Sequence, residues 1–275
     1  MFKNRDLYFK KKCSEVFLKS VFFNKIILVV NNKFYSGTSG LVLPVPQSLY
    51  PAEFQGKSRL QYYSALFNSV EINSSFYKNP KASTINKWAE SVTENFEFTF
   101  KLSKNITHVK GLDFKPEDIK NFLETINFIG NKKGCLLAQF PPGLKIEACK
   151  KLQKLLNIIN HINENDGWKI AVELRHSSWY NNEVYDMLIK NKASIVIHDL
   201  PASATPIKTL GNVMYLRFHG PGGRYRGSYP DDFLLTYAKY IKAWMGEGKT
   251  IYCYFNNTMG DAVKNLQTIN GYVQA

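Results

Sequence analysis

Short apolar segments recur along this chain, and each of them runs into polar or charged residues. Helix-like segments separate most of the eight apolar segments. In an eight-stranded α/β barrel the carboxyl ends of the strands meet on one face, where the chemistry takes place. The pattern therefore predicts eight strands that deliver polar side chains to a common mouth. They cover residues 35–39, 70–73, 98–101, 136–139, 171–175, 195–199, 215–219 and 252–257.

Apolar residues between these strands follow the spacing of amphipathic helices. The clearest stripe consists of Ile119, Phe122, Leu123 and Ile126. Pro116 suits the first turn of this helix, and Gly130 suits its end. Helices are predicted over residues 58–68, 82–92, 116–129, 146–162, 182–190, 233–245 and 261–270.

The sixth strand lacks such a helix. Residues 200–211 contain Pro201 and Pro206 and show little helical pattern, so an irregular connection is expected there. Strands that alternate with helices favour a parallel sheet. We predict an α/β fold, a single TIM-like (β/α)8 barrel that is imperfect around strand six. An open doubly wound sheet is the alternative, but residues 36–40 lack the G-x-G-x-x-G loop of a dinucleotide-binding fold.

The 275 residues suit one barrel, which typically uses about 250. We expect the barrel domain to cover residues 33–275 and residues 1–32 to form a short N-terminal extension. The basic start and the apolar residues 16–30 resemble a signal peptide. However, Lys19, Asn24 and Lys25 interrupt the apolar run, and no small-residue cleavage site follows.

The formal net charge of +14 favours an anionic partner, such as a phosphorylated metabolite or a nucleic acid. A generic lysine-rich surface is the plainer explanation. No apolar run reaches the length of a membrane span, so no membrane partner is expected. The cysteines show no C-x-x-C spacing, and nothing demands an oxidising compartment, which favours the cytoplasm. They are Cys13, Cys135, Cys149 and Cys253.

Several motifs then follow one another in order along most of the chain. They are Gly37–Gly40, Tyr50–Pro51, Val70–Tyr77, Trp88, Phe98–Lys101, Ile106–His108, Leu137–Pro142, Val172–Trp179, Asp199–Pro201, Leu216–Gly220 and Tyr252–Thr258. On these motifs the chain resembles the YecE-like family, domain of unknown function 72. The resemblance implies a TIM-barrel-like fold and no settled activity. Residues 41–46 stand where members commonly carry Trp and another aromatic residue, which implies a different ligand if that loop shapes the pocket.

Strand alternation sorts side chains between the barrel interior and the helices. On the seventh strand the inward set should be Tyr215, Arg217 and His219. By the same alternation, Glu71 and Glu173 should point into the mouth from two other strands. Two carboxylates whose environments separate their pKa values can act as general acid and base, and a histidine can assist them. We predict these catalytic roles for Glu71, Glu173 and His219.

Cations near the same mouth indicate an anionic ligand, since arginine binds phosphate or carboxylate through two parallel bonds. Lys101, Arg175 and Arg217 would bind this anion. The same cations could instead pair with Glu71 and Glu173 and only hold the barrel together. The remaining predicted ligand-binding residues are Asn73, His108, Gln139, Asp199, Tyr225, Asn256 and Asn257.

The glycine-rich residues 219–229 follow the seventh strand, where such barrels often hold phosphate. This loop could close over a ligand as a lid, with Tyr225 as its cover. No cofactor is required by the sequence, and no compact metal motif is present. A divalent metal site would have to assemble in three dimensions from His198, Asp199, His219, Glu71 and Glu173.

The leading hypothesis is a hydrolase, lyase or isomerase that uses acid/base chemistry on a phosphate-bearing or sugar-acid small molecule. The second is a barrel that binds or processes nucleic acid, suggested by the charge and by the Arg- and Tyr-containing loop. The third is a non-catalytic ligand-binding protein, which a mouth filled with mutually paired charges would favour.

Overall fold

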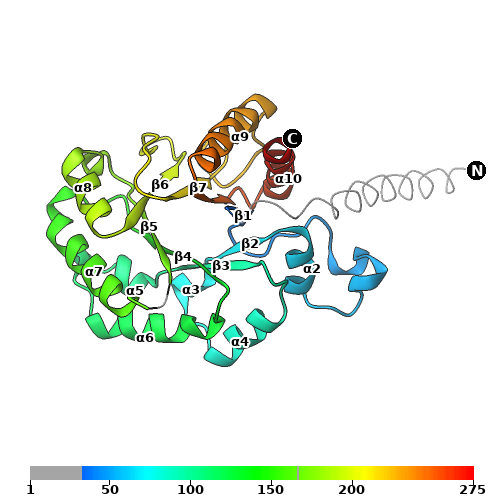
Figure 1. Cartoon of the computed structure of the whole chain (residues 1–275), viewed down its shortest axis with the longest axis horizontal. Coiled ribbons are helices and arrows are strands. Elements are labelled where there is room, and N and C mark those ends of the chain that lie inside the picture. Colours follow the sequence, from blue (N-terminus) through cyan, green and yellow to red (C-terminus); the bar gives the residue numbers. More distant parts are fainter. Residues whose placement is uncertain (1–32, 166) are drawn as a thin grey trace, which may run out of the picture. The chain divides into compact units, whose positions relative to one another are not determined.

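Eight parallel strands form the centre of the structure (Figure 1). The structure is a computed structural model, and it describes residues 33–165 and 167–275; the expected extension over residues 1–32 lies outside them. The eight strands agree with the predicted segments to within a few residues. They are β1 (Phe34–Thr38), β2 (Ser69–Ile72), β3 (Glu97–Lys101), β4 (Lys133–Gln139), β5 (Lys169–Glu173), β6 (Ala193–His198), β7 (Val213–Phe218) and β8 (Thr250–Phe255).

The strands pair in the order β1-β8-β7-β6-β5-β4-β3-β2. The first and last strands of this order meet at one parallel bridge between Ser39 and Glu71. There the Gly40 N–H donates to the Glu71 carbonyl at 2.8 Å. The sheet is thus a nearly closed barrel, and the predicted α/β TIM-like fold is confirmed.

Side chains complete the seam between β1 and β2. The Asn68 amide bonds the backbone of Ser36 (2.9 Å) and Phe34 (2.8 Å), and the Tyr63 hydroxyl bridges β1 to the Ser69 carbonyl at 3.1 Å. Gly37 lies so close to this carbonyl that a Cβ atom would stand 2.0 Å from the oxygen. Only glycine therefore fits at this point of the seam.

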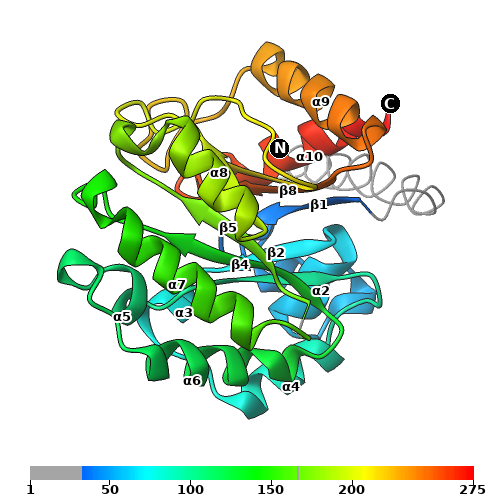
Figure 2. The same ribbon diagram turned by 60° about the vertical axis from the view of Figure 1, so that its left-hand side comes forward.

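Helices surround the outside of the strands (Figures 1 and 2). The α-helices are α2 (Arg59–Leu66), α3 (Ser74–Tyr77), α4 (Ala82–Glu90), α5 (Lys104–Thr107), α6 (Pro116–Ile126), α7 (Cys149–Ile162), α8 (Asn182–Lys190), α9 (Asp231–Gly246) and α10 (Ala262–Gln274). Short 3-10 helices cover Gln47–Leu49, Ala52–Phe54, Lys110–Leu112, Asn127–Ile129, Ile146–Ala148 and Ser177–Trp179. Within the described part of the chain, none of the helices has the length and apolar character needed to cross a bilayer.

Helix α6 shows how the sequence pattern determines these elements. Pro116 starts the helix, and the acidic residues Glu117 and Asp118 occupy its first turn, where they favour the positive end of the helix dipole. The predicted apolar stripe is fully buried, and each such side chain contributes about 1.5–3 kcal/mol. The last turn tightens into a 3-10 helix, and Gly130 ends it with φ +66°.

No helix separates β6 from β7, as the prolines of this segment predicted. Backbone bonds and one tyrosine hold the irregular connection in place. The Thr205 N–H donates to the His198 carbonyl at 3.0 Å, and the Tyr180 hydroxyl donates to the Ser203 carbonyl at 2.7 Å.

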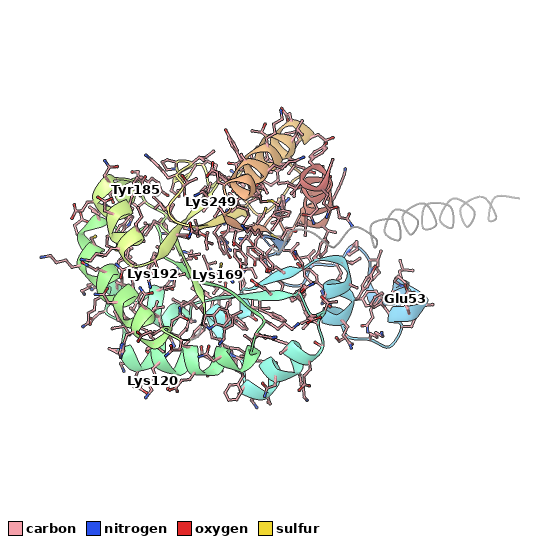
Figure 3. The ribbon with its side chains drawn as sticks, viewed as in Figure 1. Glu53, Lys120, Lys169, Tyr185, Lys192 and Lys249 are labelled. Atoms are coloured by element: carbon pink, nitrogen blue, oxygen red, sulfur yellow. The ribbon has the colours of Figure 1, made fainter. Side chains whose placement is uncertain are left out.

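Two apolar cores lie on the two sides of the strands. The larger core fills the space between strands and helices, and the smaller one fills the barrel with Cys135, Leu137, Ala171, Val196, Tyr215, Tyr252 and Tyr254. Below this core, Glu97 accepts bonds from the Tyr252 hydroxyl (2.5 Å) and Lys169 (3.5 Å); Figure 3 labels Lys169 near the middle of the barrel. Because side chains fill the interior, a ligand has to bind at the rim.

Candidate active site

The inward faces of the strands carry most of the predicted site residues. On β7, Tyr215 belongs to the barrel core and Arg217 follows it on the same face. Met214, Leu216 and Phe218 pack in the core between strands and helices. The predicted alternation is therefore confirmed, and it delivers Arg217 and His219 to the carboxyl end of the barrel.

Arg217 is the centre of a buried hydrogen-bond network. Its Nε and Nη2 donate to the two oxygens of Glu71 at 2.9 and 2.7 Å. Its Nη1 donates to Glu173 Oε2 at 2.6 Å and lies 3.3 Å from His219 Nε2. Four of the five guanidinium N–H groups are thus used within the protein, and the side chain is fully buried. Arg217 is therefore placed to organise its neighbours rather than to reach a ligand in solvent.

Glu71 is surrounded by donors. Besides the two bonds from Arg217, it accepts from the Ser39 hydroxyl and the Tyr215 hydroxyl, both at 2.6 Å. A carboxylate offers about four lone-pair positions, and these four bonds use all of them. The contacts leave Glu71 no acceptor position for a substrate.

Glu173 is less completely used. Its Oε2 accepts from Arg217, and its Oε1 accepts from Arg175 Nε at 2.6 Å. Arg175 retains 16% of its side-chain exposure, and its Nη1 and Nη2 groups have no partner among the described residues. Glu173 therefore holds Arg175 by its Nε and leaves its Nη groups without a partner in the described part of the chain.

Both carboxyl groups are held ionised. Burial opposes the charge of Glu71, but the Arg217 guanidinium and the surrounding donors outweigh it and lower its pKa. Burial also opposes the charge of Glu173, and there Arg217 and Arg175 hold the pKa well below its usual range. The two pKa values move in the same direction, so this pair does not separate into an acid and a base. A proton donor near neutral pH has to be another group.

Lys101, at the end of β3, is such a group. Its Nζ lies 4.2 Å from the centre of the Phe76 ring, and within residues 33–165 and 167–275 it forms no ion pair with a carboxylate. Burial, followed by repulsion from Arg217, lowers its pKa to about 8. At neutral pH this partly exposed amine can therefore exchange a proton.

His108 lies beside the same aromatic ring. Its imidazole packs edge-on against Phe76, with ring centres 4.7 Å apart, and its Nδ1 lies 2.9 Å from the Thr107 hydroxyl. Burial and the neighbouring Lys101 charge lower its pKa to about 4. His108 is therefore neutral at pH 7 and adds no positive charge next to Lys101.

His219 is fully buried behind Arg217. Its Nδ1 lies 3.2 Å from Asp199 Oδ1, and the other oxygen of Asp199 accepts from the Tyr229 hydroxyl. Burial lowers the pKa of His219 despite the Asp199 hydrogen bond. The neutral ring donates to Asp199 and offers Nε2 to Arg217, so its contacts are with the protein.

The predicted amides take different places. Gln139 is buried and donates to the Phe140 carbonyl at 2.6 Å, and Asn256 is nearly buried at the end of β8. Asn257 donates to the Gly227 carbonyl at 2.9 Å and to Asn265 Oδ1 at 3.0 Å, so it anchors a loop. Asn73 and Asn257 each keep a buried Oδ1 without a protein partner among the described residues.

The loop after β7 is tied to the loop after β8. The Met259 N–H donates to the Tyr225 carbonyl at 3.0 Å, and the Asp261 N–H donates to the Gly227 carbonyl at 3.1 Å. The Tyr225 ring packs edge-on against His219, with ring centres 5.6 Å apart. These bonds join the two loops, and the expectation that the loop after β7 closes over a ligand stays a prediction.

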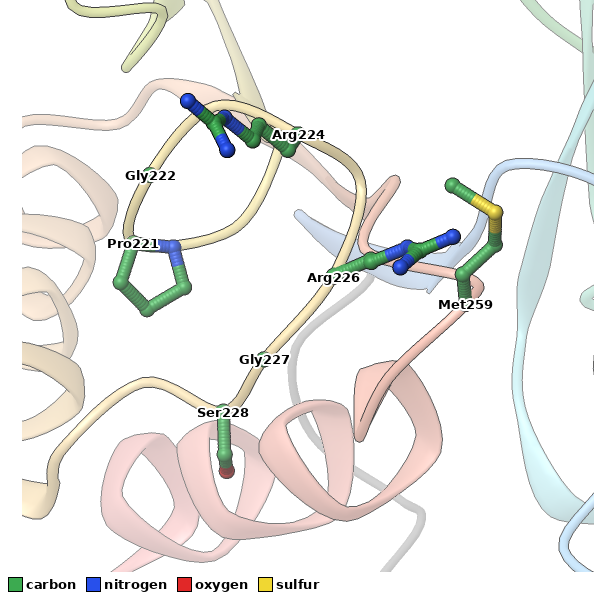
Figure 4. A pocket seen from close by; sticks show the side chains of 7 residues that line it. All are labelled: Pro221, Gly222, Arg224, Arg226, Gly227, Ser228 and Met259. Carbon is green, nitrogen blue, oxygen red and sulfur yellow. The ribbon is translucent and has the colours of Figure 1, made fainter.

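A pocket of about 560 Å³ lies beside this loop (Figure 4). In the figure the guanidinium of Arg226 points toward Met259, while that of Arg224 points away to the other side of the loop. The two charges therefore diverge instead of converging on one anion. The residues that line this pocket are Pro221, Gly222, Arg224, Arg226, Gly227, Ser228 and Met259.

The candidate metal ligands are engaged with protein partners. Among the residues that the structure describes, no three His, Cys, Asp or Glu side chains are arranged to hold a metal ion. His198 bonds the Leu174 carbonyl at 3.0 Å, while Glu71 and Glu173 bind Arg217. The side chains considered from the sequence as ligands of a divalent metal therefore form hydrogen bonds and ion pairs within the protein instead.

One residue of the site, Phe76, escaped the sequence analysis. Phe76 contacts both Lys101 and His108. Tyr215, which alternation had placed on the inward face with Arg217, donates to Glu71 from inside the barrel. Phe76 comes from the short helix α3, whose position against β3 no local pattern reveals.

Comparisons with known proteins agree with this architecture. The sequence profile of the family described as "Protein of unknown function DUF72" matches residues 35–275. The UPF0759 protein YunF of Bacillus subtilis (strain 168) is 28% identical over 251 residues, which cover 79% of this chain and 87% of that protein.

Solved structures show the same fold. The crystal structure of a DUF72 family protein from Enterococcus faecalis V583 has a TM-score of 0.72 at 23% identity, covering 88% of this chain and 96% of that one. A sugar phosphate isomerase/epimerase from Parabacteroides distasonis ATCC 8503 has a TM-score of 0.53 at 11% identity, covering 91% of this chain and 98% of that one.

Proposed function

Since this chain belongs to the DUF72 family, whose description assigns no reaction, we propose a function from the residues at its barrel mouth. The protein is an enzyme that transfers a proton to or from a small anionic molecule, and Lys101 is its acid/base group. The carrying observation is the position of Lys101 against the Phe76 ring, without a carboxylate partner in the described part of the chain. General acid/base groups work best when their pKa lies near the operating pH, and that of Lys101 is about 8.

Arg175 and Lys101 bind the anionic part of the substrate. The Nη groups of Arg175 form a fork that fits a phosphate or carboxylate, while Glu173 fixes the other end of the guanidinium. This reduces the three cations considered from the sequence to two, because Arg217 is already bound by Glu71 and Glu173. The substrate class remains a phosphate-bearing or sugar-acid small molecule.

The carboxylates take supporting roles in this proposal. Glu71 and Glu173 were the acid/base pair considered from the sequence, but both accept hydrogen bonds from arginine and both are ionised. They position Arg217 and Arg175, and His219 supports Arg217 from behind. The reaction is one that a single amine can catalyse by proton transfer, such as an isomerisation or an elimination.

The barrel of the sugar phosphate isomerase/epimerase shares the architecture at 11% identity, which concerns the fold alone. The free thiols of Cys135, Cys149 and Cys253 fit a reducing compartment, so we expect the reaction to take place in the cytoplasm.

The test measures the titration of Lys101 directly. Lysines carrying ¹³C-methyl groups are titrated by NMR in the full chain, with Lys101→Arg identifying the signal. We expect one lysine to titrate near pH 8 and to shift upward when inorganic phosphate or a sugar phosphate binds. Arg175→Gln should weaken this response, while Lys190→Gln, at the exposed end of α8 that leads into the amino end of β6, should not. A Lys101 signal that titrates like an ordinary lysine would remove the proposed acid/base group.

Nucleic-acid binding is a second candidate, favoured by Arg224 and Arg226, which are both exposed on the loop after β7. Contacts to phosphates make binding fall steeply with salt concentration. A labelled DNA duplex and a single-stranded RNA should then bind at low salt, and the double variant Arg224→Gln/Arg226→Gln should bind more weakly. Absence of binding by both probes at low salt would exclude this candidate.

A non-catalytic ligand-binding protein is the third candidate. The mutual pairing of Arg217 with Glu71 and Glu173 favours it, because this ion-pair cluster can serve the structure alone. It predicts that Lys101→Met changes ligand affinity but that no substrate is turned over by the unaltered protein. If the unaltered protein turns over a substrate and Lys101→Met does not, the non-catalytic candidate is excluded and the enzyme is supported.

A further inference from the structure

We propose that the pocket beside the loop after β7 is a docking site for an acidic peptide segment of a partner protein. The segment carries an apolar side chain between carboxylates. The apolar side chain enters the pocket, and the carboxylates meet the guanidinium groups of Arg224 and Arg226. This inference goes beyond the proposed proton transfer, because it uses neither Lys101 nor Arg175.

Two glycines allow the loops after β7 and β8 to form this pocket. Gly220 has φ +96°, and a Cβ atom there would lie 2.2 Å from the Arg226 carbonyl oxygen. A Cβ atom at Gly260 would lie 2.5 Å from both the nitrogen and the oxygen of Gly227. Backbone hydrogen bonds join the same two loops. The cavity of about 560 Å³ is therefore shaped by the backbone and is present before a partner binds.

The surface of the pocket is mostly apolar and faces solvent. Pro221 and Met259 supply much of it, and Met259 is 60% exposed. Exposed apolar surface with a polar rim is typical of interaction sites, and the flexible thioether of methionine adapts to different apolar partners. Because every residue of the lining is exposed, the pocket suits a side chain of a docking segment better than a substrate that has to be enclosed.

Two arginines without carboxylate partners flank this apolar surface. Within residues 33–165 and 167–275, neither Arg224 nor Arg226 forms an ion pair. Tyr225, between them, has φ +61°, whereas an extended backbone would put both arginines on the same side. Their guanidinium groups accordingly point to different sides of the loop (Figure 4). This spacing fits two carboxylates on different residues of a peptide better than a single phosphate group.

The same features favour a peptide over a nucleic acid. Single-stranded nucleic acids stack their bases on aromatic rings and follow a continuous basic groove. No aromatic side chain is among the described residues that line the pocket, and the Tyr225 ring packs against His219. An acidic segment supplies separate carboxylates and an apolar side chain, and it complements the net charge of +14.

The experiment follows the methyl group of Met259 in the full chain by NMR. The methionines are labelled with ¹³C-methyl groups, and Met259→Leu identifies the signal. The probe is a synthetic peptide in which glutamates flank a leucine on both sides, added at low salt. We expect the Met259 signal to shift until the peptide saturates its site. The signals of Met187 and Met214, which are buried, should move less.

Charge variants test the role of the two arginines. Arg224→Gln/Arg226→Gln should weaken peptide binding by about three- to tenfold, as expected for the loss of two exposed ion pairs. Lys150→Gln/Lys154→Gln removes the same charge from exposed positions of α7 and should change the affinity by less than about twofold. Lys101→Met should bind the peptide like the unaltered protein, so a failure of the proposed acid/base function leaves this result unchanged.

Two further probes test the occupant. A peptide with serine in place of the leucine should bind about fivefold more weakly, because it lacks the apolar contact. An unchanged Met259 signal, equal weakening in the two double variants, or equal binding of the serine peptide would overturn the docking site. A single-stranded RNA that shifts the Met259 signal and displaces the peptide would overturn it in favour of nucleic acid.

Discussion

Arg217 and Glu71 face each other with two parallel hydrogen bonds, from Nε to Oε2 at 2.9 Å and from Nη2 to Oε1 at 2.7 Å. The two residues are 146 positions apart in the chain, on β7 and β2, and both are fully buried. Their pairing fastens opposite parts of the barrel to each other. Because Arg217 is paired in this way, its charge is not available to bind a ligand at the barrel mouth.

Loss of this pairing should destabilise the protein strongly. Glu71→Gln keeps the shape of the side chain but leaves the buried Arg217 charge without its bidentate carboxylate partner. We expect the free energy of unfolding to fall by about 3–5 kcal/mol, measured by urea denaturation. Glu90→Gln, at an exposed position of α4, is the control and should change it by less than about 0.5 kcal/mol. Equal stabilities of the two variants would contradict the structural role of the pair.

The two buried carboxylates should make stability depend on acid pH. Their pKa values are lower in the folded protein than the ordinary value of 4.5, so the unfolded chain binds more protons as the pH falls. Their contribution is complete above the ordinary value and is lost as the pH falls through the folded values. Denaturation curves from pH 7 to pH 3 should therefore show decreasing stability below about pH 4.5. Glu173→Gln should flatten this dependence, and Glu147→Gln, which is exposed, should leave it steep.

Lys101→Met should stabilise the protein at pH 7. The pKa of Lys101 is lower in the folded state, because burial and Arg217 disfavour its charge. The unfolded chain therefore binds more protons between about pH 8 and pH 10.5, and the stability of the unaltered protein rises with pH in that interval. The advantage of the variant should be largest at or below pH 7 and shrink by pH 9.5 in urea denaturation. A destabilised variant at pH 7 would show that Lys101 serves the fold, whereas stabilisation is typical of functional residues.

Gly37→Ala should open the seam between β1 and β2. A Cβ atom at this position would lie 2.0 Å from the Ser69 carbonyl oxygen and 2.8 Å from the Tyr63 hydroxyl. Backbone on both sides has to move, and we expect a loss of about 1–3 kcal/mol or more in the free energy of unfolding. Gly143→Ala is the matched control, because nothing lies within 4 Å of the added atom. Similar losses in the two variants would mean that the seam tolerates the extra volume.

The sequence supported the strands and helices well, because their signals are local. All eight strands and the seven predicted helices appear where apolar spacing indicated, whereas the short helices α3 and α5 were not predicted. Pro201 and Pro206 mark the connection without a helix. Alternation on β7 also separates Arg217 from Leu216 and Phe218, which pack in the core between strands and helices. These patterns reflect which face of a helix or strand packs against the core. Residues only a few positions apart in the sequence determine that face.

The roles of the site residues depended on distances that no local pattern contains. Glu71 and Glu173 were candidates for an acid and a base, but their contacts with Arg217 lower both pKa values together. Lys101 was considered as an anion-binding cation, and its lowered pKa follows from its burial and from repulsion by Arg217.

The amino-acid order alone thus determined a barrel, the end of it that gathers polar groups, and the identity of those groups. Which charge neutralises which was decided by tertiary structure. The physical reason is that hydrophobic periodicity acts along a single element, whereas electrostatic energy depends on separations of a few ångströms between residues brought together from distant strands. Arg217 is bound between Glu71 and Glu173, and Lys101 is left beside an aromatic ring, only because the barrel closes.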